Sequence, residues 1–277
     1  MILPDLLEQD ARRDRFSRIC QLLIRAPHEQ GLAGVGTLSE KRLHAAIKTY
    51  LCENSDDHEV GFPDRRFVAD VKVDNEIFEV QTGNFAPLKP KIEYYLSATD
   101  CTVTVVHPLV KARWVSYLDP TTGELSPRRR SPKSEKLTDI FGKLYPLLPY
   151  LPNPRFRLRL LLIEEHQIRY KNKTVRVGRK RTSRIERVPL SLYEEICLNT
   201  PADYERFLPR EKLPIPFTAK DYASATGIRG LDTYTALHGL EALSLIVETN
   251  SVGRSRGYTF AGDKNRRKKQ SIVEKSD

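Results

Sequence analysis

The N-terminal part of the chain alternates apolar and polar residues with the period of an α-helix. Between residues 4 and 26 the apolar residues fall mainly three or four positions apart, which predicts one amphipathic helix. Residues 37–54 show the same period, with Leu43 and Ile47 on the apolar stripe, and predict a second helix. The chain therefore begins with two helices that are separated by a glycine-rich break.

The period changes to that of β-strands after residue 58. The polar pair Asp74-Asn75 stands between two alternating runs and predicts a two-residue hairpin turn. The elements predicted here are, in chain order, strands over residues 58–62, 65–73 and 76–83, a helix over 88–96 and a strand over 101–108. We therefore expect the order helix, three strands, helix, strand.

The middle of the chain mixes strand patterns with basic loops. The predicted elements are a strand over residues 111–119, a basic loop over 128–134, a helix over 134–148, a strand over 156–170, a basic hairpin or loop over 171–187, and short helices over 189–199 and 202–209. The chain contains no internal repeat.

Residues 213–262 have the pattern of a winged helix-turn-helix. A helix-turn unit contains Gly227 at the end of its first helix, and a second helix runs into two strands that flank the loop VGRSRG, which resembles a wing. We divide the chain into an N-terminal helical segment (1–36), an α/β core (37–120), an α+β extension with a basic hairpin (121–210), a winged helix (211–262) and a disordered basic tail (263–277).

The hairpin places two carboxylates opposite each other. A turn at Asp74-Asn75 puts Val73 opposite Glu76. Three residues further from the turn on each strand, it puts Asp70 opposite Glu79. Like charges at the ~5 Å Cβ separation of such pairs destabilise a sheet, so a cation is expected between them. Alternation places Asp70, Lys72, Glu79 and Gln81 on one face and Ala69, Val71, Val73, Phe78 and Val80 on the other, core-facing one. Oxygen ligands of this kind suit Mg²⁺ or Mn²⁺.

These residues resemble a known superfamily. Asp70, an eight-residue gap and Glu79-Val80-Gln81, preceded by Glu40 on a helix, resemble the PD-(D/E)XK nuclease superfamily over roughly residues 38–107. The resemblance implies a restriction-endonuclease-like α/β fold, a mixed sheet flanked by helices. It also implies that Asp70 and Glu79 are metal ligands and that Glu40 is an auxiliary ligand. At finer grain, most of the chain resembles an uncharacterised bacterial family of hypothetical proteins, to which no activity is attached.

One position departs from the superfamily pattern. Gln81 stands where the family usually has lysine, and a glutamine brings no positive charge and transfers a proton less readily. Lys91, at the start of the next predicted helix, is the first choice for a replacement, ahead of Lys89 and Lys72. His44 follows Glu40 by one helical turn and is placed to approach the same cleft.

Each candidate also has a plainer interpretation. Asp70 and Glu79 fit an exposed sheet face on which carboxylates pair with Lys72 and surface arginines. Glu40 fits the first turn of a helix, where a carboxylate caps the backbone and interacts with the helix dipole. Lys91 fits a solvated helix position.

The net charge of the chain indicates which kind of partner it binds. The chain has 46 Lys and Arg against 36 Asp and Glu, a formal net charge of +10, which favours a polyanion such as DNA. In the predicted winged helix, the second helix would expose Asp232 and the wing would contact phosphate or the minor groove. The residues expected to bind DNA are Arg229, Thr233, Thr235, His238, Arg254 and Arg256.

The remaining composition excludes several classes of protein. The four cysteines lie far apart without CxxC or Cys/His clustering, which argues against zinc and disulfide frameworks, and the lack of a long apolar run argues against a membrane protein. We therefore expect a cytoplasmic, metal-dependent endonuclease that cuts DNA, as a homodimer where both strands are cut. The alternatives are a non-catalytic DNA-binding or regulatory protein that retains a degenerate nuclease fold, and a nuclease that acts on RNA.

Overall fold

The structure is a computed structural model that describes residues 4–25, 35–63, 66–119, 121–170 and 184–262 of the 277-residue chain. The predicted basic tail and most of the basic stretch 171–187 lie outside the described residues. The chain forms two compact units. The first comprises Met1–Asn84, Pro90–Lys136 and Leu158–Cys197, and the second comprises Phe85–Lys89, Leu137–Arg157 and Leu198–Asp277. Among the described helices, none has the length and apolar character needed to cross a membrane.

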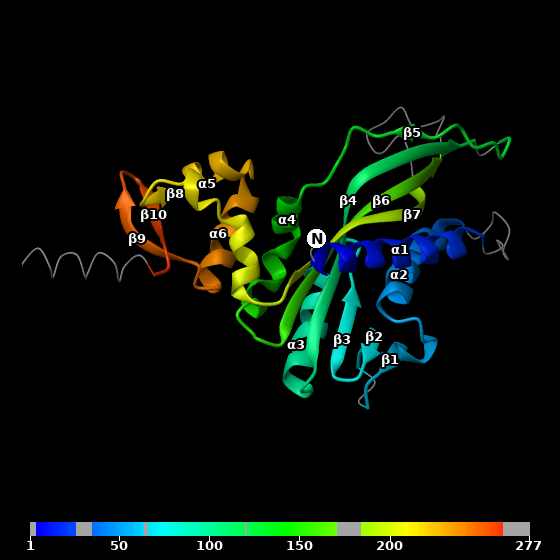
Figure 1. Ribbon diagram of the computed structural model, residues 1–277, viewed down its shortest axis with the longest axis horizontal. Helices are drawn as coiled ribbons and strands as arrows, with labels where there is room; N and C mark the ends of the chain where they lie inside the picture. Colours follow the sequence, from blue (N-terminus) through cyan, green and yellow to red (C-terminus); the bar gives the residue numbers. More distant parts are fainter. Residues whose placement is uncertain (1–3, 26–34, 64–65, 120, 171–183, 263–277) are drawn as a thin grey trace, which may run out of the picture. The chain divides into compact units, whose positions relative to one another are not determined.

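A mixed seven-stranded sheet forms the centre of the α/β fold (Figure 1). Its strand order is β1-β2-β3-β4-β6-β7, and β5 pairs with β4. β1, β2 and β3 are antiparallel, whereas β3 and β4 are parallel and are joined through a helix. The strands are β1 (His58–Gly61), β2 (Val68–Val73), β3 (Glu76–Val80), β4 (Thr102–Leu118), β5 (Arg129–Arg130), β6 (Phe156–Tyr170) and β7 (Arg184–Leu198).

Two long helices pack on one face of this sheet. Helices α1 (Pro4–Arg25) and α2 (Val35–Leu51) share a buried cluster with side chains from β2, β3, β4, β6 and β7. The cluster includes Phe16, Ile19, Leu43, Ile47, Val71, Phe78, Val80, Val106, Val110, Leu161, Ile163 and Leu192. Helix α3 (Lys89–Ala98) contacts the opposite face, because its side chains bond to Glu79, which alternates with Phe78 and Val80.

The predicted order of elements around the hairpin is confirmed. Helix α2 is followed by β1, β2 and β3, then by α3 and β4. The hairpin turn is also confirmed, since Val73 pairs with Glu76 and Val71 with Phe78, and Asp74 adopts the positive φ of 48° that such a turn requires.

Three predictions of secondary structure are wrong. The two short strands predicted over 101–108 and 111–119 are one strand, β4, which runs through Pro108. Residues 189–199 are not helical but form most of β7. The helix predicted over 134–148 is broken into a 3₁₀ turn, the single α-turn α4 (Phe141–Leu144) and another 3₁₀ segment. In each case the pairing of a strand or the placing of prolines overrides the apolar period.

The second unit contains short helices and a small sheet. Helix α5 (Ala219–Thr226) ends at Gly227 in the left-handed conformation, as predicted, and α6 (Leu231–Ala242) follows after a short turn. Strands β8 (Phe217–Thr218), β9 (Ile246–Val252) and β10 (Ser255–Phe260) form an antiparallel sheet with the order β8-β10-β9. Within the residues that the structure describes, the 3₁₀ segments are Ser55–Asp57, Ala86–Leu88, Leu137–Ile140, Tyr145–Tyr150, Pro201–Phe207 and Arg210–Lys212.

Candidate functional site

The two carboxylates of the hairpin lie where its strands part. Pairing between β2 and β3 ends at Val71 and Phe78, although β2 continues back to Val68 along β1 and β3 continues to Val80 along β4. The carboxylate of Asp70 fills this gap, and its Oδ2 accepts the backbone N–H of Val80 at 2.7 Å. The Asp70 side chain thus takes the place of the β2 backbone as hydrogen-bond partner of Val80. The two strands are therefore separated at the position of Asp70.

A histidine from α2 reaches the same oxygen. His44 Nε2 lies 3.2 Å from Asp70 Oδ2. Burial acts to raise the pKa of Asp70, but the hydrogen bond and charge of His44, with smaller effects from Val80 and Lys91, lower the pKa below its ordinary value. Asp70 is therefore held as a carboxylate at neutral pH.

Glu79 is the most deeply buried acidic group of the site, with 1% of its surface exposed. Its Oε2 accepts a hydrogen bond from Lys91 Nζ at 2.6 Å and its Oε1 accepts one from the Tyr95 hydroxyl at 2.9 Å. Lys91 and Tyr95 are one helical turn apart on α3, so a single helix face supplies both donors. Burial, and then the charge of Asp70, raise the pKa of Glu79 to about 7 although Lys91 acts against them.

The donors at this opening fit a hard divalent cation. Mg²⁺ and Mn²⁺ are commonly held by one or two carboxylates and keep several waters, and Asp70 and Glu79 supply two such groups. Among the described residues, both hydrogen bonds to Asp70 go to Oδ2, which leaves Oδ1 for a cation. The negative charges of Asp70 and Glu79 repel each other, and this repulsion contributes to the raised pKa of Glu79. A bound cation would reduce the repulsion. No group of three or more His, Cys, Asp or Glu with metal-binding geometry occurs in the described ranges.

The other predicted members of the site behave differently. Lys91, the predicted replacement for the missing lysine, does contact a carboxylate of the pair. Gln81 continues from β3, but its Oε1 turns back to accept the backbone N–H of Gly83 at 3.2 Å. Glu40 is part of α2 one turn before His44, and its side chain lies outside the described residues.

Two buried polar residues at the site were not predicted. Tyr95 falls within the helix predicted over 88–96, where its spacing from Lys91 places both residues on one face. His107 is fully buried, and its Nδ1 bonds to the carbonyl oxygen of Gln81. No signal in the sequence singles out His107, because it ends an otherwise apolar run and its contact depends on the register of β3 and β4.

Of the residues predicted to bind DNA in the second unit, some are exposed and others are buried. Arg229, His238, Arg254 and Arg256 are exposed. The expected exposure of Thr233 and Thr235 is wrong, because 3% and 7% of their surfaces are accessible.

The error in α6 is one of helical phase. The buried stripe of the helix runs through Thr233, Ala236 and Leu240, whereas its exposed face carries Leu231, Tyr234 and His238. Asp232 lies between the two faces and is partly buried.

Comparison with known proteins places the chain in a family. No curated protein and no solved structure matches the chain. A family model described as "Domain of unknown function (DUF8091)" matches residues 41–199, more than half of the chain. The match extends from α2 to the end of β7 and includes Asp70, Glu79 and Lys91. The chain belongs to this family of domains of unknown function.

Proposed function

We propose that the chain is a metal-dependent endonuclease that hydrolyses DNA phosphodiester bonds at the opening between β2 and β3. The observation that carries the proposal is the closeness of the Asp70 and Glu79 carboxylates beyond the last paired residues of β2 and β3, with Lys91 bonded to Glu79. The order α2, β1, β2, β3, α3, β4 around this opening agrees with the resemblance to the PD-(D/E)XK superfamily.

Each residue has a distinct role in this proposal. Asp70 and Glu79 would hold Mg²⁺ or Mn²⁺, which polarises a phosphate and lowers the pKa of an attacking water when bound. Lys91 supplies, from α3, the cation that the superfamily carries at the position of Gln81. His44 bonds to one oxygen of Asp70 and fixes the orientation of that carboxylate. Tyr95 does the same for Glu79.

We further propose that the second unit is a winged helix that positions the duplex. Helices α5 and α6 with the three-stranded sheet β8-β10-β9 have the element order of that motif. Arg254 and Arg256, exposed at the β9–β10 turn, would contact phosphate there. Arg229 and His238 would do so from the start and the exposed face of α6.

A second candidate function is DNA binding without cleavage. The observation that favours it is the conformation of Gln81, whose side-chain oxygen accepts the backbone N–H of Gly83 in its own turn. In this alternative, Lys91 permanently neutralises Glu79 and takes the place of a metal.

Plasmid cleavage separates the two functions. We expect wild-type protein to nick or linearise supercoiled plasmid with Mg²⁺ or Mn²⁺ and to lose this activity in EDTA, in Asp70→Asn and in Glu79→Gln. Asp74→Asn is the matched control, since it removes an exposed carboxylate of the same hairpin at a positive-φ position that asparagine tolerates. Metal-dependent cleavage that persists in both site variants contradicts the proposal.

A further inference from the structure

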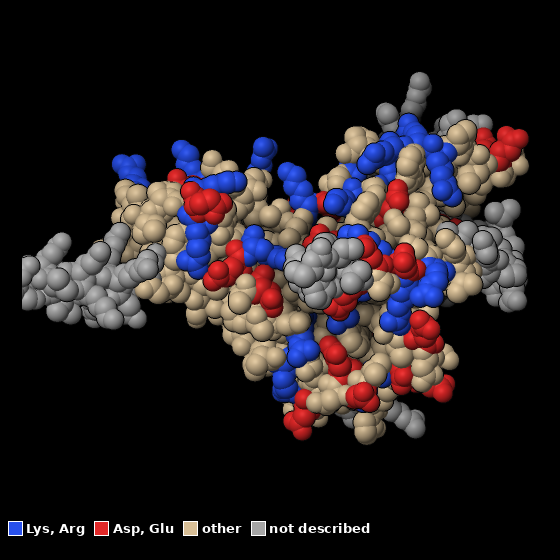
Figure 2. Space-filling model, in the orientation of Figure 1, with Lys and Arg blue, Asp and Glu red and all other residues tan. Residues whose placement is uncertain are grey.

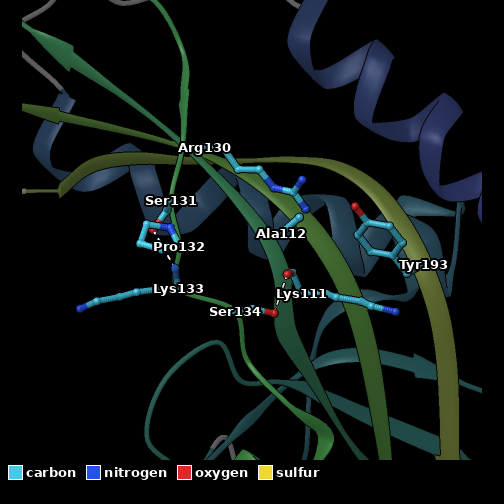
Figure 3. A pocket seen from close by; sticks show the side chains of 8 residues that line it. All are labelled: Lys111, Ala112, Arg130, Ser131, Pro132, Lys133, Ser134 and Tyr193. Carbon is cyan, nitrogen blue, oxygen red and sulfur yellow. Dashed lines mark hydrogen bonds between the residues drawn. The ribbon is translucent and has the colours of Figure 1, made fainter.

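A basic hollow lies along β4, beyond the point where β3 ends. Its volume is about 610 Å³, and it is lined by Lys111, Ala112, Arg130, Ser131, Pro132, Lys133, Ser134 and Tyr193 (Figure 3). Three of these eight residues are cations, three carry hydroxyl groups, and none is acidic. In Figure 2, Lys and Arg side chains gather over the part of the sheet where Figure 1 labels β5.

Backbone hydrogen bonds fix the basic segment that forms one side of the hollow. After β3 ends, residues 129–135 take its place beside β4. Arg130 pairs with Trp114, the N–H of Ser131 donates to the carbonyl of Arg113 at 2.8 Å, and the hydroxyl of Ser134 donates to the carbonyl of Lys111 at 2.7 Å. Arg130 and Lys133 are therefore carried on a segment that hydrogen bonds hold against β4.

Tyr193 of β7 forms the other side of the hollow. The side chains of Lys111 and Arg130 both extend toward its ring (Figure 3), and Lys111 Nζ lies 5.2 Å from the ring centroid. The carbonyl oxygen of Tyr193 accepts a hydrogen bond from Arg13 Nε at 2.7 Å, which ties β7 to α1 at this point. Cations gathered beside a phenol and hydroxyl groups form a surface suited to phosphate oxygens.

The hollow and the candidate site share one face of the sheet. Val106 and Val110 both pack in the core beneath α1 and α2, so Lys111 projects from the opposite face, where Glu79 lies. Val106 pairs with Val80 at the opening, and Lys111 follows five residues later, about 16 Å along the strand at ~3.3 Å per residue. That distance is about five base-pair steps of 3.4 Å in duplex DNA.

We propose that this hollow binds the phosphate backbone of duplex DNA on one side of the bond to be cut. Lys111 and Arg130 would contact phosphate oxygens across Tyr193, with Lys133 at the outer rim and the Ser131 hydroxyl as a further donor. The inference rests on the proposed function for the identity of the ligand, whereas the binding itself requires no catalysis.

DNA binding in EDTA tests the hollow apart from cleavage. The experiment measures fluorescence anisotropy of a labelled duplex of about 30 base pairs between about 50 and about 200 mM NaCl. Lys111→Ala, Arg130→Ala and Lys133→Ala should each weaken binding roughly three- to tenfold and lower the slope of log affinity against log salt by about 0.9. The triple variant should lose more than any single one.

Arg18→Ala is the matched control, since it removes one exposed cation from α1, which packs on the other face of the sheet. We expect it to bind with wild-type affinity and salt slope. The proposal that the hollow binds DNA is refuted when the triple variant binds the duplex as Arg18→Ala does, or when wild-type protein does not bind the duplex. Cleavage that persists in Asp70→Asn overturns the proposed function instead. The binding measurement then still tests whether the hollow binds DNA, because it does not depend on cleavage.

Discussion

Lys91→Met is expected to reduce DNA cleavage by about 10²- to 10⁴-fold while the protein stays folded. Lys91 Nζ is bonded to Glu79 Oε2 at 2.6 Å and retains 22% side-chain exposure at the opening of the sheet. Methionine keeps the length and the apolar stem but removes the charge. Because Lys91 acts to lower the pKa of Glu79, its removal leaves that carboxyl protonated to higher pH.

The pH profile of cleavage distinguishes this role from a purely structural one. We expect the residual activity of Lys91→Met to reach its maximum at a higher pH than that of wild type, and Lys91→Arg, which keeps the charge, to lie between them. Lys89→Met is the control, because Lys89 begins the same helix and is exposed. Equal rates and pH profiles for the two methionine variants contradict the role assigned to Lys91.

Glu165→Gln is expected to lower the free energy of unfolding of the first unit by about 3–5 kcal/mol. Glu165 is fully buried, and its two oxygens accept hydrogen bonds from Arg113 Nε at 2.7 Å and Arg187 Nε at 2.6 Å. Removal of the carboxylate charge leaves the buried guanidinium of Arg187 and the partly buried guanidinium of Arg113 without their shared anion. Urea unfolding monitored by circular dichroism measures the loss.

The effect of Glu165 depends on pH. Burial raises the pKa of Glu165, but Arg187 and Arg113 outweigh it and hold the pKa below its ordinary value. Its stabilising contribution is therefore complete above the pKa of the unfolded chain, about 4.3, and is lost as the pH falls through the lower pKa of the folded state. Glu53→Gln is the control, because Glu53 is 69% exposed in its pair with Arg15 and should change stability by less than about 1 kcal/mol. Equal losses for the two variants contradict the prediction.

The sequence predicted the hairpin well because its signals are local. The pair Asp74-Asn75 and the alternation of Val71 and Phe78 determine both the turn and the register, and the approach of Asp70 to Glu79 follows from them. The contact of Lys91 with the carboxylate pair was also predicted, because the helix that carries Lys91 follows the hairpin directly in the chain.

The rest depended on contacts that a single sequence does not reveal. Residues 189–199 suggest a short helix in the sequence, yet they pair as an outer strand of the sheet in β7. Thr233 and Thr235 were placed on the wrong face because small polar residues fit either side of a helix, and packing decides which side is buried. Gln81 was predicted to act in the site, but a local bond to Gly83 competes for its side chain.

Manganese binding tests the central claim, that Asp70 and Glu79 hold a divalent cation, most directly. Electron paramagnetic resonance counts free Mn²⁺ as the metal is titrated into the protein without DNA. The account predicts that wild type and Asp74→Asn bind Mn²⁺ with the same affinity and that Asp70→Asn and Glu79→Gln each weaken binding at least tenfold, about 1.4 kcal/mol. Equal Mn²⁺ affinity in all four proteins would contradict it.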